Sequence, residues 1–171
     1  PETTDAPWAG RAGLSAVVHR GAIYVLGGSQ GDDASTGGTG RVLFNDVWMA
    51  RAGRTSLPAA EPGPRSAPRA GAAVVSMGGY ISLLGGERGF SCGFGPNPCQ
   101  PATQTLYFTD VWRSRDGASW ELVTASAGWS PRPGHQCVDL LNRIVCFGGY
   151  GEVPGSPPIP ANPTDMWTSR D

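Results

Sequence analysis

Residues 69–86 read RAGAAVVSMGGYISLLGG, two short runs of apolar residues between an Arg-Ala-Gly start and a closing glycine pair. The same pattern occurs at residues 11–28 and, with Pro in place of Ala, at residues 132–149. In each copy the same interval separates the first glycine from the glycine pair. Three copies in register define an internal repeat, and the repeat has to be interpreted before any single motif.

Each copy has the composition of a β-hairpin, because β-branched and apolar runs flank a short turn-prone segment. After the glycine pair comes an insert that differs between copies, then an Asp-x-Trp motif, and in the second copy a further apolar run at residues 120–123. Four antiparallel strands per unit are typical of a β-propeller blade. The repeated positions are Arg11, Arg69 and Arg132, the pairs Gly27-Gly28, Gly85-Gly86 and Gly148-Gly149, then Asp46, Asp110 and Asp165, and finally Trp48, Trp112 and Trp167.

This combination of Arg-x-Gly, hairpin, Gly-Gly, Asp-x-Trp and a later Trp resembles the kelch repeat over nearly the whole chain. The resemblance implies an all-β fold of kelch-type propeller blades, with the first strand of each blade at the central channel and ligands meeting loops at one rim. We expect about three blades, at about 9–60, 66–126 and 130–171, the last without its fourth strand. Closed propellers have about 4–8 blades, so we expect part of a larger propeller that is completed by blades of the same or another chain.

Composition excludes several functions. All thirteen cationic side chains of the 171 residues are Arg, so a Walker phosphate loop and a Schiff-base lysine are impossible. The net charge of −1 argues against nucleic acid as a partner. No apolar window is long enough to span a membrane.

The four cysteines suggest two disulfides. Cys137 and Cys146 should face each other across the third hairpin, although apolar residues occupy the equivalent positions in the other units and two buried thiols are the alternative. Cys92 and Cys99 lie in a Gly/Pro-rich segment that a disulfide could clasp. Two bridges predict a secreted or cell-surface protein. With only two histidines and wide cysteine spacing, we expect no metal and no cofactor.

Motifs that resemble catalytic sites have structural explanations. A Gly-x-Ser-x-Gly match at residues 89–93 is followed by prolines that forbid the helix a nucleophile elbow needs. Residues 114–120 resemble the Asp-box turn of sialidase-type propellers, which implies that Asp116 accepts turn amides and that Trp120 packs between sheets. Each unit carries one repeated Arg and one repeated Asp, so we expect ion pairs rather than an anion-binding ring, and the Asp-x-Trp indoles should pack within or between blades.

Function should lie in the inserts, because loops vary freely on a rigid scaffold. The second insert presents the aromatic and arginine mixture of contact surfaces, so Arg88, Phe90, Phe94 and Tyr107 form the candidate binding loop. The sequence thus predicts a non-enzymatic extracellular module that binds a protein or a glycan. Two alternatives are the scaffold portion of a larger carbohydrate-active propeller enzyme and an intracellular kelch adaptor with reduced thiols.

Overall fold

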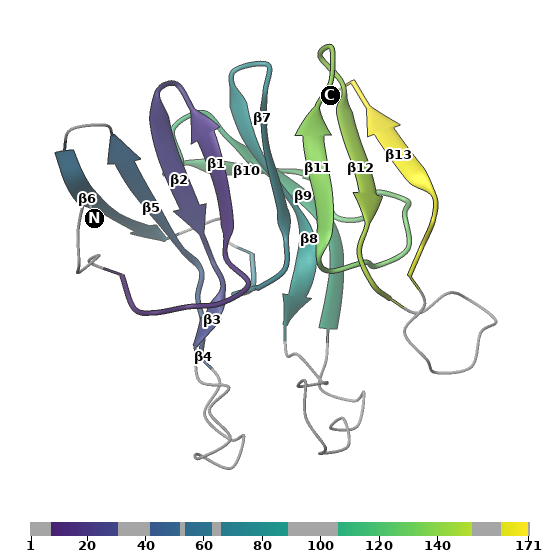
Figure 1. The fold of residues 1–171 in the computed structure, drawn as a ribbon, viewed down its shortest axis with the longest axis horizontal. Coiled ribbons are helices and arrows are strands. Elements are labelled where there is room, and N and C mark those ends of the chain that lie inside the picture. Colours follow the sequence, from purple (N-terminus) through teal and green to yellow (C-terminus); the bar gives the residue numbers. More distant parts are fainter. Residues whose placement is uncertain are drawn as a thin grey trace.

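The computed structural model describes residues 8–30, 42–51, 54–62, 66–88, 106–151 and 162–170. Its strands form three blade-like antiparallel sheets and one small two-stranded sheet (Figure 1). None of the described segments is a helix that could cross a membrane. The all-β prediction is confirmed.

Each blade-like sheet begins with a hairpin and adds its later strands outward. The first has the order β1 (Ser15–His19), β2 (Ala22–Leu26), β5 (Asp46–Arg51), β6 (Arg54–Pro62). The second has the order β7 (Ala73–Met77), β8 (Tyr80–Arg88), β9 (Leu106–Ser114), β10 (Trp120–Thr124). The third contains β11 (His135–Asp139), β12 (Ile144–Gly148) and β13 (Met166–Ser169), and the small sheet pairs β3 (Ser29–Gln30) with β4 (Val42–Leu43).

The hairpin registers agree among the repeats. Val74 lies opposite Leu83 in β7 and β8, and Cys137 lies opposite Cys146 in β11 and β12. Because side chains alternate between the two faces of a strand, this shared register gives every sheet the same pair of faces.

The sheets pack face against face, with β1, β7 and β11 side by side at the inner edge (Figure 1). One buried cluster joins Tyr24 and Val47 of the first sheet to Ile81 of the second. Another joins Leu84 of the second sheet to Cys146 of the third. The core therefore consists of apolar layers between neighbouring sheets.

The Arg-x-Gly glycines connect the sheets through their backbones. The Gly71 amide donates to the Gly13 carbonyl at 2.9 Å, and the Gly134 amide donates to the Gly71 carbonyl at 2.7 Å. A side chain on Gly71 would place its Cβ only 3.2 Å from the Gly134 nitrogen. The glycine of the motif thus allows the inner strands of successive blades to approach closely.

The structure differs from the predicted boundaries at the inserts. The second glycine pair lies inside β8, which continues to Arg88, and β9 already begins at Leu106. In the first repeat, β3 and β4 add a short ladder at the same place. Strand pairing therefore continues into the predicted inserts, because paired backbone groups are favoured over unpaired ones near a buried layer.

Candidate functional site

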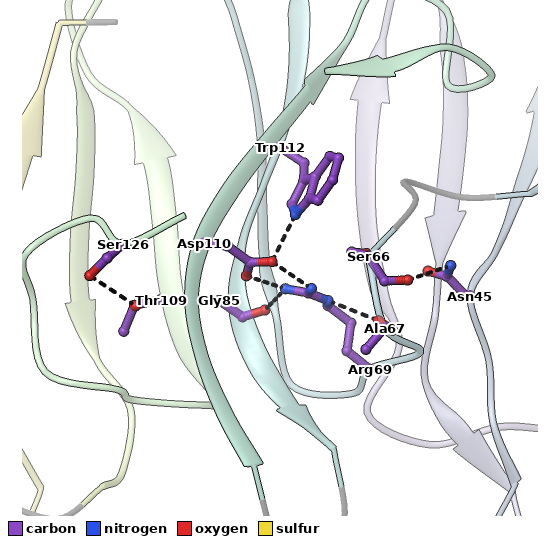
Figure 2. A network of polar contacts seen from close by, with 9 residues as sticks. All are labelled: Asn45, Ser66, Ala67, Arg69, Gly85, Thr109, Asp110, Trp112 and Ser126. Atoms are coloured by element: carbon purple, nitrogen blue, oxygen red, sulfur yellow. Dashed lines mark hydrogen bonds and ion pairs between the residues drawn. The ribbon is translucent and has the colours of Figure 1, made fainter. Parts of the chain in front are cut away.

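Each repeat builds one Arg–Asp–Trp unit around a buried arginine, and Figure 2 shows the unit of the second repeat. In the second repeat, the Arg69 guanidinium donates to both carboxylate oxygens of Asp110, at 2.6 and 2.8 Å, and to the Gly85 carbonyl at 2.7 Å. The Trp112 indole donates to the same carboxylate at 2.7 Å. The predicted Arg–Asp pairing is confirmed in the second repeat, and it lies within the blade.

The other repeats copy this geometry. Arg11 holds Asp46 at 2.5 and 2.9 Å, and Arg132 holds Asp165 at 2.5 and 2.9 Å. The three arginine side chains are only 1–3% exposed. Because these guanidinium groups are buried and already bound to a carboxylate, they cannot form an anion-binding ring.

These contacts lower the pKa values of the three carboxylates. Burial would raise the pKa of Asp110, but hydrogen bonds from Arg69 and Trp112 outweigh burial and lower it. The pKa of Asp46 falls for the same reasons. At the more exposed Asp165, the hydrogen bond from Arg132 lowers the pKa to about 2. All three carboxylates are therefore charged at neutral pH.

An aromatic ring beneath two of the arginines was missed by sequence reasoning. The Arg11 guanidinium lies 3.9 Å from the Phe44 ring centroid, and Arg69 lies 4.3 Å from that of Phe108. Each phenylalanine comes two residues before the repeated Asp, a spacing that could have revealed it. These stacks contribute cation–π attraction and shield the ion pairs from water.

The turn between β9 and β10 has the predicted structural role. Asp116 Oδ1 accepts hydrogen bonds from the backbone amides of Ala118 and Ser119, both at 2.9 Å. Trp120 packs on the cluster between the first and second sheets, as does Trp112. In the third sheet, Trp167 is 37% exposed and lies against Trp129, with ring centroids 6.3 Å apart. In the first sheet, Trp48 lies against Trp8, with ring centroids 6.0 Å apart.

The strands that flank the three inserts end at one edge of the molecule, the lower edge in Figure 1. We call it the insert edge, and it includes the β3–β4 ladder, the adjoining ends of β8 and β9, and the adjoining ends of β12 and β13. There Arg88 is exposed and lies opposite Leu106, whereas Tyr107 is half-buried opposite Glu87. Phe90 and Phe94 lie outside the described residues, as does the Gly-x-Ser-x-Gly match.

A polar contact joins the second and third blades at this edge. Glu87 is 3% exposed, and its Oε1 accepts a hydrogen bond from the Tyr150 hydroxyl at 2.8 Å. Tyr107 meets Tyr150 edge to face, with ring centroids 6.3 Å apart. A weak sequence signal for this cluster exists, since Glu87 and Tyr150 are the residues directly after two of the glycine pairs.

The cysteines divide between described and undescribed residues. Cys137 and Cys146 form a disulfide, with their Cα atoms 4.2 Å apart, as predicted. Cys92 and Cys99 lie outside the described residues. Within the described ranges, no three His, Cys, Asp or Glu side chains are grouped as a metal ion would require.

Comparison with known proteins identifies the fold. No protein-family model matches the chain. Among solved structures, that of YjhT, a kelch-repeat β-propeller, superposes on 96% of this chain with a TM-score of 0.64 and 19% sequence identity. The match covers 44% of the YjhT chain, so the present chain spans less than half of that propeller's length. The three sheets are therefore blades of a kelch-like β-propeller fold.

Proposed function

We propose that this protein is a non-enzymatic binding module that contacts another protein or a glycan through its insert edge. The observation that carries the proposal is that the strand pairs flanking all three inserts end at one edge (Figure 1). The repeated charges beneath that edge are held in Arg–Asp–Trp units, which leaves recognition to the residues that vary between repeats.

The experiment is a binding screen with matched variants. The protein is applied to a printed array of N- and O-glycans and to a panel of immobilised extracellular proteins. Arg88→Ala and Phe90→Ala/Phe94→Ala should weaken any hit at least about tenfold, as expected for aromatic and arginine anchors. Leu141→Ala is the control, since Leu141 is 89% exposed in a hairpin turn at the opposite edge. Hits that respond to Leu141→Ala but not to the insert variants would contradict the proposal.

We place the protein outside the cell or on its surface, on the strength of the Cys137–Cys146 disulfide. The intact mass of the denatured protein should rise by about 4 Da on reduction if the second predicted pair is also bridged. Complete alkylation of the protein without reductant would instead favour the intracellular adaptor.

A second candidate rests on the contact between Glu87 and Tyr150. A carboxylate that accepts a hydrogen bond from a phenol hydroxyl at 2.8 Å resembles a base beside a nucleophile, which would suit the carbohydrate-active alternative. The structural interpretation is favoured, because Glu87 is buried and the contact bridges two blades. Hydrolysis of an aryl glycoside that Tyr150→Phe abolishes, with unchanged thermal unfolding, would support the enzyme instead.

A further inference from the structure

The edge opposite the inserts is formed by the tips of the inner hairpins and by the far ends of three other strands (Figure 1). Register places Arg51 of β5 opposite Ala22, next to the first hairpin turn. It places Ser114 of β9 opposite Ile81, next to the second turn, and Ser169 of β13 opposite Ile144, next to the third. We call this the hairpin edge.

Positive charge is concentrated on the hairpin edge. The net charge of −1 for the whole chain conceals this segregation. Asp116, Glu121 and Asp139 are the acidic residues of the described segments on this edge, and they are outnumbered. The arginines on this edge are Arg20, Arg51, Arg113, Arg115, Arg143 and Arg170.

The arginines of the two edges differ in burial and in ion pairing. Near the insert edge, the repeated arginines are buried and bound to aspartate. On the hairpin edge, Arg20, Arg115 and Arg143 are exposed and take part in none of the ion pairs among the described residues. Their guanidinium groups are therefore available to an external anion.

The acidic neighbours are engaged in other contacts. Glu121 pairs with Arg113 at 2.5 Å in an exposed contact. Asp116 accepts turn amides, and Asp139 Oδ1 accepts the Asn142 amide at 3.0 Å. These three carboxylates offset only part of the charge of the six arginines, so a positive excess remains on this edge.

Two of these arginines contact Tyr80. The guanidinium groups of Arg113 and Arg115 lie 4.6 and 4.3 Å from its ring centroid, and Arg115 donates to its hydroxyl at 2.5 Å. Arg20 reaches the carbonyl of neighbouring Gly79 at 3.5 Å. Two arginines of the second blade thus contact one aromatic ring, and Arg20 of the first blade is held at the residue before it, so binding an anion would cost less side-chain entropy.

We propose that the hairpin edge binds an acidic polysaccharide, through its carboxylate or sulfate groups. Guanidinium groups fit such oxyanions with two parallel hydrogen bonds, and all cationic side chains of this chain are Arg. The arginines extend across all three blades, an arrangement that suits a linear polymer with repeated charges. The disulfide favours a compartment where such polymers, rather than nucleic acids, are found.

The test uses heparin as the sulfated probe, polygalacturonate as the carboxylated probe and duplex DNA as the competing polyanion, at low and high salt. Wild-type protein should bind at least one polysaccharide, more weakly as salt screens the charges. Arg20→Ala/Arg115→Ala/Arg143→Ala should weaken binding at least about tenfold, because three oxyanion contacts are lost. Gln136→Ala is the control, because Gln136 is exposed in the middle of β11 and lies on neither edge, and it should leave binding unchanged.

A second variant separates loss of binding from misfolding, because Arg115 contacts Tyr80 and its replacement removes that contact. Arg51→Gln/Arg143→Gln changes side chains that make no hydrogen bond within the described segments, and it should also weaken binding with unaltered thermal unfolding. Absence of binding to both polysaccharides, or unchanged binding by both variants, would overturn the proposal. Tighter binding to DNA than to either polysaccharide would also overturn it, in favour of a nucleic-acid surface.

Discussion

At the scale of single residues, the repeated ion pairs hold the blades in register. Asp110 receives three hydrogen bonds from side chains that the sequence places 41 and 2 residues away. Because breaking a buried pair leaves a buried charge uncompensated, the loss of unfolding free energy on replacing each aspartate should increase with its burial.

We therefore expect Asp110→Asn to lower the free energy of unfolding by about 3 kcal/mol, since Arg69 would keep its charge in a buried site. Asp165→Asn is the matched variant in the third repeat. Its carboxylate side chain is 49% exposed, against 17% for Asp110, so the loss should be smaller. Urea unfolding of both variants measures the difference, and equal losses would contradict this explanation.

The second glycine of each pair has a positive φ, a backbone conformation that other residues rarely adopt. Gly86 has φ 97°, and a Cβ there would lie 2.8 Å from the Ala70 carbonyl oxygen. Gly86→Ala should cost about 3 kcal/mol of unfolding free energy through strain and collision. Gly128→Ala has a similar φ of 81° but open space around it, so thermal unfolding should show a loss of only about 1 kcal/mol. A larger loss at Gly128 would be contrary to expectation.

At the scale of elements, hairpins were predicted well because their signals are local. The pairing of Cys137 with Cys146 followed from counting residues across one turn. The extension of β8 to Arg88 was missed, since ladder pairing with β9 depends on residues far along the chain. The contact of Glu87 with Tyr150 joins different blades, and only the assembled structure brings these residues together.

The disulfide in the third hairpin adds stability that the other hairpins obtain by packing. Cys137→Val/Cys146→Leu copies the apolar pair of the second repeat, and it should preserve the fold. The loss of unfolding free energy should be about 2–3 kcal/mol, as a short closed loop is released in the unfolded state. Denaturant unfolding with and without reductant measures it, and a reductant-insensitive wild-type midpoint would contradict the prediction.

At the scale of the whole molecule, acid should destabilise the protein. The lowered pKa values of Asp46, Asp110, Asp116 and Asp165 mean that the folded state holds these carboxylates charged at a pH where unfolded ones take up protons. This stabilisation is complete when the pH is above the ordinary aspartate pKa of 3.8. It is lost as the pH falls through the pKa values of the folded state, and the pKa of Asp165 in the folded state is about 2. The thermal midpoint should therefore drop steeply below about pH 4, and a flat profile down to pH 2 would contradict the ion-pair assignment.

The outer faces of the first and third sheets carry exposed apolar side chains, among them Ile23 at 50% and Phe147 at 41% exposure. The equivalent faces inside the structure are buried between blades, so we expect further blades to cover these ones. In a propeller whose further blades cover this face, Ile23→Asp should then cost about 2 kcal/mol or more of unfolding free energy. Leu141→Asp, at an 89% exposed turn, should change stability by less than about 0.5 kcal/mol. Equal, small effects in thermal unfolding would mean that the first sheet's outer face is solvated.

The fold was predictable from three registered repeats, whereas the charge segregation between the two edges was not. Net charge is a sum over the chain and contains no positions. Only the packing of the first two blades brings His19 to the Arg115 carbonyl and Arg20 to the Gly79 carbonyl. The buried Arg–Asp pairs were predictable, because each repeat carries one residue of each sign at a fixed place.

The most direct test of a structural ion-pair layer beneath a binding edge compares Asp110→Asn with Arg88→Ala, by urea unfolding and by binding to a ligand found in the array or protein screen. Asp110→Asn should lose stability and keep its affinity in the folded fraction, whereas Arg88→Ala should keep its stability and lose affinity. A stable Asp110→Asn protein without affinity, or an Arg88→Ala protein with unchanged affinity, would contradict this account.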